Sequence, residues 1–509
     1  MTEPLLIADQ WCSPPPDGAT FHSFDPASGV QNPERFPVSD WAQLERIAEV
    51  ARTATIALRE TPPGRIATFL ERFAEAIEDE SGPLAAAAAR ETALPRDTRL
   101  LGVELPRTVA QLRAAAEAAR DQSPGGWRRP RIDRDADIRS VLEPLDGAVL
   151  VMGPNNFPFA FNAISGGDFA AALAAGNCII AKGHPAHPLT TRLLARCAAS
   201  ALEDASLPPG TVQCFYHAAH RDVARLIEHP AVAAVAFTGG ESAGRAVKSA
   251  ADRSGTICSL EMSSLNPVVL CPGLDEEELD AFAEQWSASV LMGSGQFCTK
   301  PGICLMLGDR AVADRVVSAV AGRFSESPAM PLLAETLVRE LESGVQQLQD
   351  AGAVLECGGT PGDSAGFHYQ PTLLRANTPT FLEMPVTFQR ELFGPAALVV
   401  DCEDRDQLER CIGSLGGQLT CCVWTGARLP DPPLARDLNR MLRPLCGRLL
   451  RNKMPTGVAV TDAMVHGGPF PATAHPGFTA VGLPESLHRF TARRCYDGVP
   501  QDELPPILR

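Results

Sequence analysis

Lysine is scarce in this chain of 509 residues. Four of the 45 basic residues are lysines, and the other 41 are arginines. The lysines are Lys182, Lys248, Lys300 and Lys453. A genome rich in arginine codons would account for the total. Where lysine persists, two explanations stay open: chance retention at a tolerant surface position, or a need for a compact ammonium group that a planar guanidinium cannot replace.

Long apolar runs are absent as well. The longest strongly apolar pieces, such as Ala148–Met152, have the length of a buried strand, far below the ~20 residues that a membrane-spanning helix needs. Met1–Trp11 has neither a basic region nor a long apolar core, so we expect no secretory signal. The net charge of −16 argues against nucleic acid or an anionic membrane surface as a partner.

Paired cysteine motifs are also missing. The 15 cysteines show no Cys-x-x-Cys spacing and no Cys/His cluster along the sequence, and their number is odd. In a long chain without a secretory signal, this pattern indicates reduced thiols in the cytoplasm. The sequence therefore predicts a cytoplasmic protein without a metal site.

The chain does contain a long alternation of strand and helix patterns. Its 45% hydrophobic and 21% charged residues are ordinary for a soluble globular protein, and its length predicts two or three domains. Apolar residues at helical spacing predict early helices at Trp41–Leu58, Arg65–Glu80 and Glu104–Arg120. Buried strands that alternate with helices are predicted at Gly147–Met152, Cys178–Lys182, Val212–Tyr216, Val232–Phe237 and Gly255–Leu260.

A second pattern of this kind runs from 266 to 461. Its predicted helices are Leu279–Leu291, Arg310–Phe324 and Leu333–Gln349, and its predicted strands are Ile303–Leu307, Ala396–Val400 and Cys421–Trp424. Strands that alternate with helices form parallel sheets with helices on both faces. The predicted fold class is therefore α/β, with two doubly wound parallel-sheet domains.

A cysteine between small residues is the main candidate for chemistry. Cys298 lies in Gly293-Ser294-Gly295-Gln296-Phe297-Cys298-Thr299, and Glu261 ends a predicted strand upstream. A thiol nucleophile needs room for its substrate and a nearby group that handles protons. We interpret the small neighbours as the room and Glu261 as the proton acceptor. A lone cysteine is more often a buried small hydrophobe, so this hypothesis depends on the other segments.

Polar and small residues follow several of the predicted strands. Asn156 follows the first strand, Lys182 ends the second, Gly239 follows the fourth, and Glu261 ends the fifth. In an open parallel sheet, ligands bind at the carboxyl ends of the strands. Each residue alone has an ordinary explanation, such as a strand-to-helix turn at Gly239–Gly244. Their order along the chain predicts one common site.

These segments resemble the aldehyde dehydrogenase superfamily, and the resemblance covers nearly the whole chain. It implies that Cys298 is the nucleophile, Glu261 the general base and Asn156 the amide that stabilises an oxyanion. It also implies NADP or NAD as the cofactor and a small-molecule aldehyde as the substrate. The implied cofactor residues are Lys182 and Glu391 at the ribose hydroxyls, Phe393 beside the nicotinamide, and Gly239, Gly240 and Gly244 at the pyrophosphate turn.

The resemblance further implies a division of the chain. It assigns an NAD(P)-binding domain to 1–130 and 145–261, a catalytic domain to 262–465, and a small oligomerisation flap to 131–144 and 485–509. Arg131–Glu143 alternates loosely, which predicts one extended, partly exposed strand. The free edge of such a strand needs a partner, so we expect a homodimer or homotetramer.

Departures from the family pattern affect the cofactor. The usual Lys-Pro-x-Glu reads Lys182-Gly183-His184-Pro185, so the carboxylate that would repel a 2′-phosphate is missing. We therefore expect NADP to be used at least as well as NAD, with His184 or Arg221 near the phosphate. Gly240 replaces a frequent serine. Ser263 and Ser264 replace the glycines of Glu-Leu-Gly-Gly, a change that would narrow the cofactor channel or shift Glu261.

Two segments favour a particular substrate. Gln296–Gly302 and Ala463–Thr473 look like the corresponding parts of the 2,5-dioxovalerate (α-ketoglutaric semialdehyde) dehydrogenases and of their long-chain aldehyde relatives. We therefore favour a semialdehyde that carries a carboxylate, such as 2,5-dioxopentanoate. A long-chain aldehyde stays open because three phenylalanines could form an apolar tunnel: Phe157, Phe159 and Phe161. No arginine that would hold a distal carboxylate can be identified from the sequence, and His466 is expected to be structural rather than catalytic.

Two further functions stay open. A CoA-acylating aldehyde dehydrogenase passes the acyl group to CoA and needs no general base, which Glu261 argues against. A catalytically silent family member would serve as a binding or structural protein. The intact Cys298, Glu261 and Asn156 argue against this second alternative, while Ser263 keeps it open.

Overall fold

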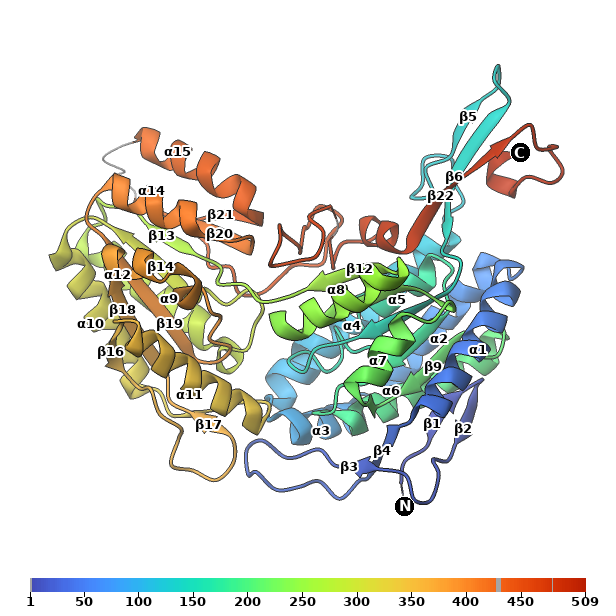
Figure 1. Ribbon diagram of the computed structural model, residues 1–509, viewed down its shortest axis with the longest axis horizontal. Helices are drawn as coiled ribbons and strands as arrows, with labels where there is room; N and C mark the ends of the chain where they lie inside the picture. The colour runs from blue at the N-terminus through green and yellow to red at the C-terminus, as the bar shows by residue number, and fades with distance from the viewer. Residues whose placement is uncertain (1, 427–431, 478) are drawn as a thin grey trace.

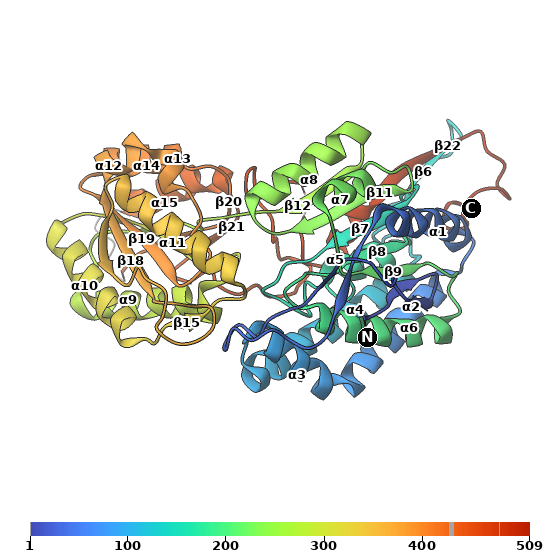
Figure 2. The same cartoon turned by 60° about the horizontal axis from the view of Figure 1, so that its bottom comes forward.

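The computed structural model describes residues 2–426, 432–477 and 479–509. Two lobes lie side by side, each built around a seven-stranded sheet, and a small three-stranded sheet projects from the first lobe (Figures 1 and 2). Helices cover both faces of the two large sheets. The predicted α/β class with parallel sheets is confirmed.

The first lobe is formed by the N-terminal half of the chain. Its sheet has the order β12–β11–β7–β8–β9–β1–β2, in which the first five strands are parallel and β1–β2 is an antiparallel hairpin at the edge. The strands are β1 (Leu5–Ile7), β2 (Gln10–Cys12), β7 (Ala148–Met152), β8 (Ile179–Lys182), β9 (Val212–Phe215), β11 (Val232–Thr238) and β12 (Ile257–Glu261). The five strands predicted between 147 and 261 are present, with ends displaced by one or two residues.

Eight helices among the described residues belong to this lobe. They are α1 (Trp41–Arg59), α2 (Pro63–Asp79), α3 (Ser81–Thr92), α4 (Leu105–Arg120), α5 (Gly167–Ala174), α6 (Pro188–Ala205), α7 (His220–Ile227) and α8 (Glu241–Ser254). A π-helical segment, η1 (Arg96–Glu104), leads directly into α4. The helix α1 begins at a capping box, in which Asp40 and Gln43 each accept a hydrogen bond from the other's backbone N–H.

Strand register brings the predicted site residues to one edge of this sheet. Met152 is level with Lys182 on β8 and with Phe237 on β11, and Thr238 is level with Glu261 on β12. All of these strands run in parallel, so their carboxyl ends share one edge. The expectation that these strand ends lie together is confirmed by the pairing.

The second lobe contains a sheet of order β16–β18–β19–β14–β13–β20–β21, parallel except for the antiparallel edge strand β16. Its strands are β13 (Val268–Leu270), β14 (Ile303–Leu307), β16 (Val354–Cys357), β18 (Thr372–Asn377), β19 (Ala396–Cys402), β20 (Gln418–Trp424) and β21 (Cys446–Arg451). Val268 and Leu270 pack into one apolar cluster and Val269 into another, so both faces of the sheet are covered.

The helices of the second lobe include the three predicted ones. They are α9 (Glu276–Leu291), α10 (Arg310–Glu326), α11 (Glu335–Asp350), α12 (Thr378–Glu383), α13 (Pro385–Phe388), α14 (Arg405–Ser414) and α15 (Pro432–Leu442). A capping box formed by Asp275 and Glu278 begins α9. Short pieces complete the described fold: β3 (Thr20–Phe21), β4 (Phe36–Ser39), β10 (His217–Ala218), β15 (Met330–Pro331), β17 (His368–Tyr369), and the 3₁₀ turns η2 (Met292–Gly295), η3 (Arg443–Leu445), η4 (Glu485–Phe490) and η5 (Pro506–Leu508).

The projecting sheet corrects one expectation. Arg131–Glu143 was predicted as a single strand, but it folds back on itself as β5 (Arg131–Asp133) and β6 (Ile138–Pro144). The turn between them contains Asp137 with a left-handed backbone, at φ 52°. The C-terminal strand β22 (Thr491–Asp497) pairs with β6, which gives the order β22–β6–β5.

Among the helices that the structure describes, none has both the length and the apolar character that crossing a membrane would require.

Candidate active site

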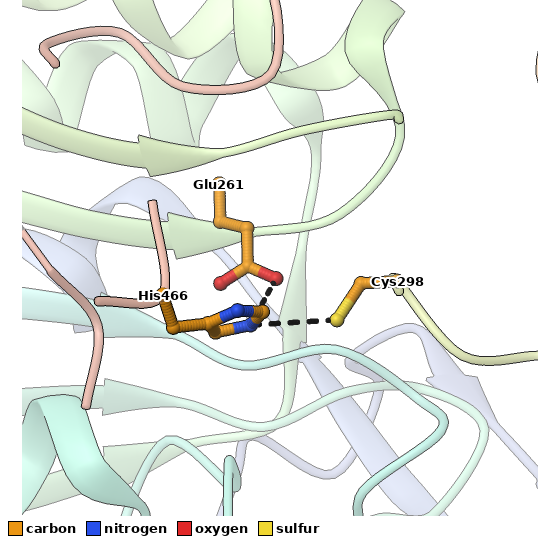
Figure 3. A group of neighbouring side chains, drawn as sticks. All are labelled: Glu261, Cys298 and His466. Atoms are coloured by element: carbon orange, nitrogen blue, oxygen red, sulfur yellow. Dashed lines mark hydrogen bonds and ion pairs between the residues drawn. The ribbon is translucent and has the colours of Figure 1, made fainter. Parts of the chain in front are cut away.

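Three side chains from distant parts of the chain meet between the two lobes. Glu261 ends β12, Cys298 follows η2, and His466 lies on the segment 452–477, through which the chain returns to the first lobe. His466 Nε2 lies 2.9 Å from Glu261 Oε1 and 3.4 Å from Cys298 Sγ. Figure 3 shows the ring beneath the carboxylate, with the thiol to one side and contacts from the ring to both groups. The three groups therefore form one contact chain.

Sequence reasoning gave His466 a structural role, whereas the structure places its ring against both predicted catalytic side chains. The His466 backbone is held on both sides: its N–H donates to Thr479 Oγ1 at 2.7 Å, and its carbonyl accepts from Ala480 N at 2.8 Å. The only sequence signal was its position inside the segment Ala463–Thr473, which resembled a subgroup. Spacing along the chain could not relate it to Cys298, which lies 168 residues away.

Glu261 is a buried but ionised carboxylate. It is 4% exposed. Burial alone would raise the pKa of its carboxyl, but the adjacent His466 and the Cys298 thiol hold that pKa below its ordinary value. Apart from the contacts with His466 and the Cys298 thiol, neither of its oxygens accepts a hydrogen bond from a residue that the structure describes. The carboxylate therefore has a lone pair available for a proton.

Cys298 is a protonated thiol in this environment. Its surroundings withdraw the sulfur from water, and this burial raises the pKa of the thiol well above its ordinary value; the negative charge of Glu261 raises the pKa further. A thiolate, rather than a thiol, is the nucleophile. A base must therefore remove the proton during the reaction, and the Glu261–His466 pair is in position to do so.

The small residues before Cys298 form a tight turn. Gly293, Ser294 and Gly295 all have left-handed backbones, with φ of 58°, 58° and 67°. A Cβ at Gly295 would lie 2.0 Å from the carbonyl oxygen of Gly394, so no other residue fits there. We interpreted these residues as room for a substrate, and the structure instead assigns them to close packing of the turn against the segment that follows Glu391.

Asn266 holds the nucleophile segment in place, a role that the sequence pattern did not indicate. Its side-chain N–H groups donate to the carbonyl oxygens of Cys298 at 2.9 Å and Lys300 at 2.8 Å. Its Oδ1 accepts from the hydroxyls of Ser264 at 3.0 Å and Thr420 at 2.9 Å. The buried amide is fully engaged, so it fixes the backbone on both sides of Thr299.

Asn156 also lies against the nucleophile segment. It is 7% exposed, and its Nδ2 donates to the carbonyl oxygen of Gln296 at 2.7 Å. The backbone N–H of Leu333 in turn donates to Gln296 Oε1 at 3.0 Å, which ties the segment to the second lobe. The structure therefore brings the three predicted catalytic residues to one place, with the Asn156 amide beside the turn that carries the cysteine.

Lys300 illustrates why lysine persists at one buried position. Its side chain is 1% exposed, and Nζ donates to the carbonyl oxygens of Gly394 at 3.0 Å and Ala396 at 2.9 Å, with a third bond to Leu392. An ammonium group directs three donors at three converging acceptors, and a planar guanidinium does not. This geometry supports the compact-ammonium explanation at Lys300. Burial raises the pKa of the neighbouring Glu391 carboxyl, while the Lys300 charge opposes that rise.

Phenylalanines line the side of the site that faces α4. The rings of Phe157 and Phe297 have centroids 5.2 Å apart, and Phe161 lies 5.2 Å from Phe157 and 6.2 Å from the His466 ring. Phe159 was expected in the same tunnel, but it is fully buried in the core of the first lobe. The chain turns between Phe157 and Phe161, so the Phe159 side chain lies in the core rather than at the site.

The carboxyl edge of the first sheet has an open position at a helix N-terminus. Gly240 precedes the 14-residue helix α8 without a side-chain cap, and a Cβ there would meet nothing within 4 Å. This leaves open space in front of a helix N-terminus, the usual place for a phosphate. Ser263 lies beside this opening, where its hydroxyl accepts from Glu241 N at 3.3 Å. Ser263 thus contacts the first turn of α8, and Glu261 still reaches Cys298.

Lys182 ends β8 at the same edge. Burial lowers the pKa of Lys182 to about 8, and its Nζ makes one long contact, 3.4 Å to Gly183 O. Burial and nearby positive groups lower the pKa of His184 well below its ordinary value, so this ring is neutral. Arg221 is on α7, its side chain is 88% exposed, and its Nε lies 3.7 Å from Asp222 Oδ1.

Two of the predicted cofactor glycines have a packing explanation. A Cβ at Gly239 would lie 2.6 Å from the Phe237 ring, and a Cβ at Gly244 would lie 2.6 Å from Met262. Both positions therefore let α8 approach the sheet closely. Phe393 is partly exposed in the second lobe, beyond Glu391. A role of these residues in cofactor binding stays a prediction.

The tertiary structure also brings together a cluster of possible metal ligands that lie far apart in the sequence. Among the described residues, Glu261, Cys298 and His466 place an oxygen, a sulfur and a nitrogen atom within 4.8 Å of one another. Such a mixed set could ligate a divalent ion. The absence of a resident metal stays a prediction.

Comparison with known proteins places the chain in a family. A family model described as the aldehyde dehydrogenase family matches residues 13–468. The α-ketoglutaric semialdehyde dehydrogenase 2 of Azospirillum brasilense is 38% identical over 502 residues, which cover 96% of this chain and 93% of that protein. The α-ketoglutaric semialdehyde dehydrogenase of Acinetobacter baylyi is 34% identical over 478 residues, covering 92% and 88%.

The fold has close counterparts among solved structures. A 3,6-anhydro-L-galactose dehydrogenase solved in complex with NADP has a TM-score of 0.81 at 21% identity, covering 97% of this chain and 99% of that chain. The sequence resemblance is thereby confirmed: the chain belongs to the aldehyde dehydrogenase family and is an oxidoreductase that acts on aldehyde groups.

Proposed function

We propose that the protein oxidises a semialdehyde with a distal carboxylate, such as 2,5-dioxopentanoate, to the carboxylic acid with NADP or NAD. The observation that carries this proposal is the contact of the buried Glu261–His466 pair with the Cys298 thiol. A protonated thiol next to an ionised carboxylate is the arrangement that acyl transfer through a cysteine needs. The names of the two relatives described above support the substrate class.

In the first half of the proposed reaction, Cys298 Sγ attacks the aldehyde carbon while its proton passes to the Glu261–His466 pair. The carbonyl oxygen becomes an alkoxide, and the Asn156 amide and the backbone N–H of Cys298 stabilise it. Each such donor contributes ~3 kcal/mol. A nicotinamide cofactor, held by Lys182 and the N-terminus of α8, would supply the hydride acceptor when bound. Loss of a hydride converts the tetrahedral carbon into a thioester on Cys298.

In the second half, water hydrolyses the thioester. The proton of the first half has by then passed to solvent, so the Glu261 carboxylate takes a proton from the water as the water oxygen attacks the thioester carbon. The carbon–sulfur bond breaks, the carboxylic acid leaves, and the sulfur takes back the proton that Glu261 drew from the water. His466 acts as a positioning residue, because its ring holds the carboxylate 2.9 Å from Nε2.

We further propose that the first sheet holds the cofactor and that 262–465 carries the nucleophile. Lys182 would contact a ribose and the open N-terminus of α8 the pyrophosphate. Pro185 supplies no carboxylate to repel a 2′-phosphate. Of the two basic candidates for that phosphate, Arg221 is preferable to His184, since the His184 ring is neutral.

A cytoplasmic location is proposed on the state of the cysteines. All 15 are free, including the exposed Cys495. Free thiols on this scale are typical of a reducing compartment.

The substrate panel that tests the proposal uses 2,5-dioxopentanoate and hexanal, each with NADP and NAD and each with and without CoA. We expect kcat/KM for dioxopentanoate to exceed that for hexanal, and the product to be the free acid whether or not CoA is present. An acyl-CoA product would favour the CoA-acylating alternative. Absence of reduced cofactor with every aldehyde would favour a silent family member.

The same panel tests cofactor preference. We expect kcat/KM with NADP to equal or exceed that with NAD, because no carboxylate stands at position 185. A preference for NAD beyond about a hundredfold, or ~2.7 kcal/mol, would show that another group binds the 2′-hydroxyl.

The projecting sheet is proposed to join two or more copies of the chain. Its outer strand β5 is exposed, and Ile132 and Ile138 are 42% and 38% exposed on the hairpin. An unpaired strand edge with apolar side chains needs cover. Light scattering at micromolar concentration should give the mass of a dimer or tetramer, and the mass of a single chain would contradict this proposal.

A further inference from the structure

Arg107, on α4, has a buried donor without a protein partner. Its Nε donates to Gln111 Oε1 at 3.0 Å and its Nη1 to Val458 O at 3.4 Å, whereas Nη2 is buried and has no hydrogen-bond partner among the described residues. No described carboxylate forms an ion pair with this guanidinium. A buried charged donor without a partner costs several kcal/mol. The Nη2 group of Arg107 therefore lacks a hydrogen-bond acceptor among the described residues.

Arg107 lies close to the catalytic groups. Its Cζ is 5.2 Å from the centroid of the Phe161 ring, and that ring is 6.2 Å from the ring of His466, which contacts Cys298. Its positive charge lowers the pKa of the Cys298 thiol, although burial outweighs this effect. The guanidinium is thus separated from the reacting sulfur by one layer of aromatic rings.

A second arginine approaches from the other lobe. Arg448, on β21, donates from Nη1 to Gly457 O at 3.1 Å, next to the Val458 carbonyl that Arg107 contacts. Thr456, in the same short segment, donates to Thr299 O at 3.5 Å, directly after Cys298. Among the described residues, Arg448 also has no ion-paired carboxylate. Two guanidinium groups therefore flank one segment that is tied to the nucleophile.

A third arginine near the aromatic rings, Arg99, differs from Arg107 and Arg448. Its Nη2 lies 3.4 Å from the buried Glu104 Oε2, so its charge is balanced within the protein. Its Cζ stacks 4.4 Å from the Phe157 centroid. Arg99 Nε and Nη2 also lack a hydrogen-bond partner among the described residues, but Arg99 has a carboxylate within ion-pair distance. Arg107 has none, and Glu104 acts on its charge only from a longer distance.

We propose that Arg107 binds the distal carboxylate of the substrate through Nη2, with Arg448, which donates to the same segment 455–458, adding a second positive charge. This proposal rests on the proposed function, because it assigns the residue that selects carboxylate-bearing aldehydes over uncharged ones. A guanidinium and a carboxylate form short, charge-assisted hydrogen bonds. The aromatic rings between them and the thiol would contact the carbon chain of the substrate.

The test compares a matched pair of aldehydes, 5-oxopentanoate and pentanal, which differ in whether the far end is a carboxylate or a methyl group. For the wild type we expect a higher kcat/KM for 5-oxopentanoate. The variant Arg107→Met should lower the ratio of the two kcat/KM values by about 100-fold. Arg107→Lys keeps the charge but loses the planar fork, and should lower the ratio by about tenfold.

Arg113→Met is the matched control, because Arg113 is on the same helix and its exposed side chain pairs with Glu78. This change should alter the ratio less than about twofold. A second readout needs no turnover: calorimetry should show that glutarate binds the wild-type protein at least about tenfold more tightly than Arg107→Met. Thermal melts of both variants show whether they fold.

The outcomes separate the two proposals. If the wild type oxidises neither aldehyde, the proposed function fails. If it oxidises both equally well, the carboxylate class and the role of Arg107 fail together. If the wild type prefers 5-oxopentanoate and a folded Arg107→Met keeps that preference and its affinity for glutarate, only the role of Arg107 is overturned. A lowered melting temperature with an unchanged ratio would mark Arg107 as structural.

Discussion

Replacing Cys298 by alanine should reduce aldehyde oxidation to less than ~1% of the wild-type rate while cofactor binding stays intact. Removal of the sulfur eliminates the covalent route, and neither Glu261 nor His466 can take its place as a nucleophile toward the aldehyde carbon. The rate is measured as reduced cofactor formed, and cofactor affinity by fluorescence titration. Turnover above that level in the variant would overturn the assignment of the nucleophile.

Cys304→Ala provides the control for this change. Cys304 is a fully buried cysteine on β14, six residues along the chain, and it packs in the core of the second lobe. Its replacement should cost about 1 kcal/mol of stability and leave most of the turnover. The comparison separates the loss of a reactive sulfur from the loss of a packed side chain.

The pH dependence of thiol modification tests the same assignment. Burial and the charge of Glu261 raise the pKa of the Cys298 thiol. The thiolate fraction therefore grows as the pH rises, so the alkylation rate of Cys298 should climb from about pH 7 to about pH 9. Mass spectrometry after iodoacetamide treatment measures it. A rate that is already constant at neutral pH would mean that the thiol is ionised without help from a base.

Glu261→Gln should separate the two halves of the reaction. The amide cannot accept a proton from water, so hydrolysis of the thioester should slow by about 10²–10⁴-fold. Because the Glu261–His466 pair also takes the thiol proton, the burst itself should be slower than in the wild type, but it should still reach about one reduced cofactor per active site before near silence. Rapid-mixing absorbance records the burst, and the trapped thioester adds the mass of the acyl group to the protein. An unchanged steady-state rate would show that another group is the base.

His466→Gln gives the matching test of the positioning role. Without the ring, burial would be opposed only by the Cys298 thiol and the charge of Arg489, so the pKa of the Glu261 carboxyl should rise. The base must be ionised to work, and the activity that is lost on acidification should therefore be lost at a higher pH than in the wild type. A merely structural histidine would lower the melting temperature without moving the acidic limb of the kcat profile.

Much of the first lobe could be predicted because its central strands are buried on both faces. Ala148–Met152 and Ile179–Lys182 are continuous apolar runs, a pattern that parallel strands between helices require. The strands β13, β18 and β21 could not be predicted in this way. They are short or carry polar residues, and they are strands because their neighbours in the sheet supply hydrogen-bond partners.

The sequence by itself determined the family and the fold class. It also identified Cys298, Glu261 and Asn156 as candidates, since the carboxyl ends of parallel strands lie at one edge of the sheet. Only the tertiary structure decided which other side chains join them. His466 and Arg107 are 359 positions apart in the chain, so no local pattern relates them. Both lie near the Phe161 ring, a placement that depends on the return of segment 452–477 to the first lobe and on the cost of leaving a buried charge or carbonyl without a partner.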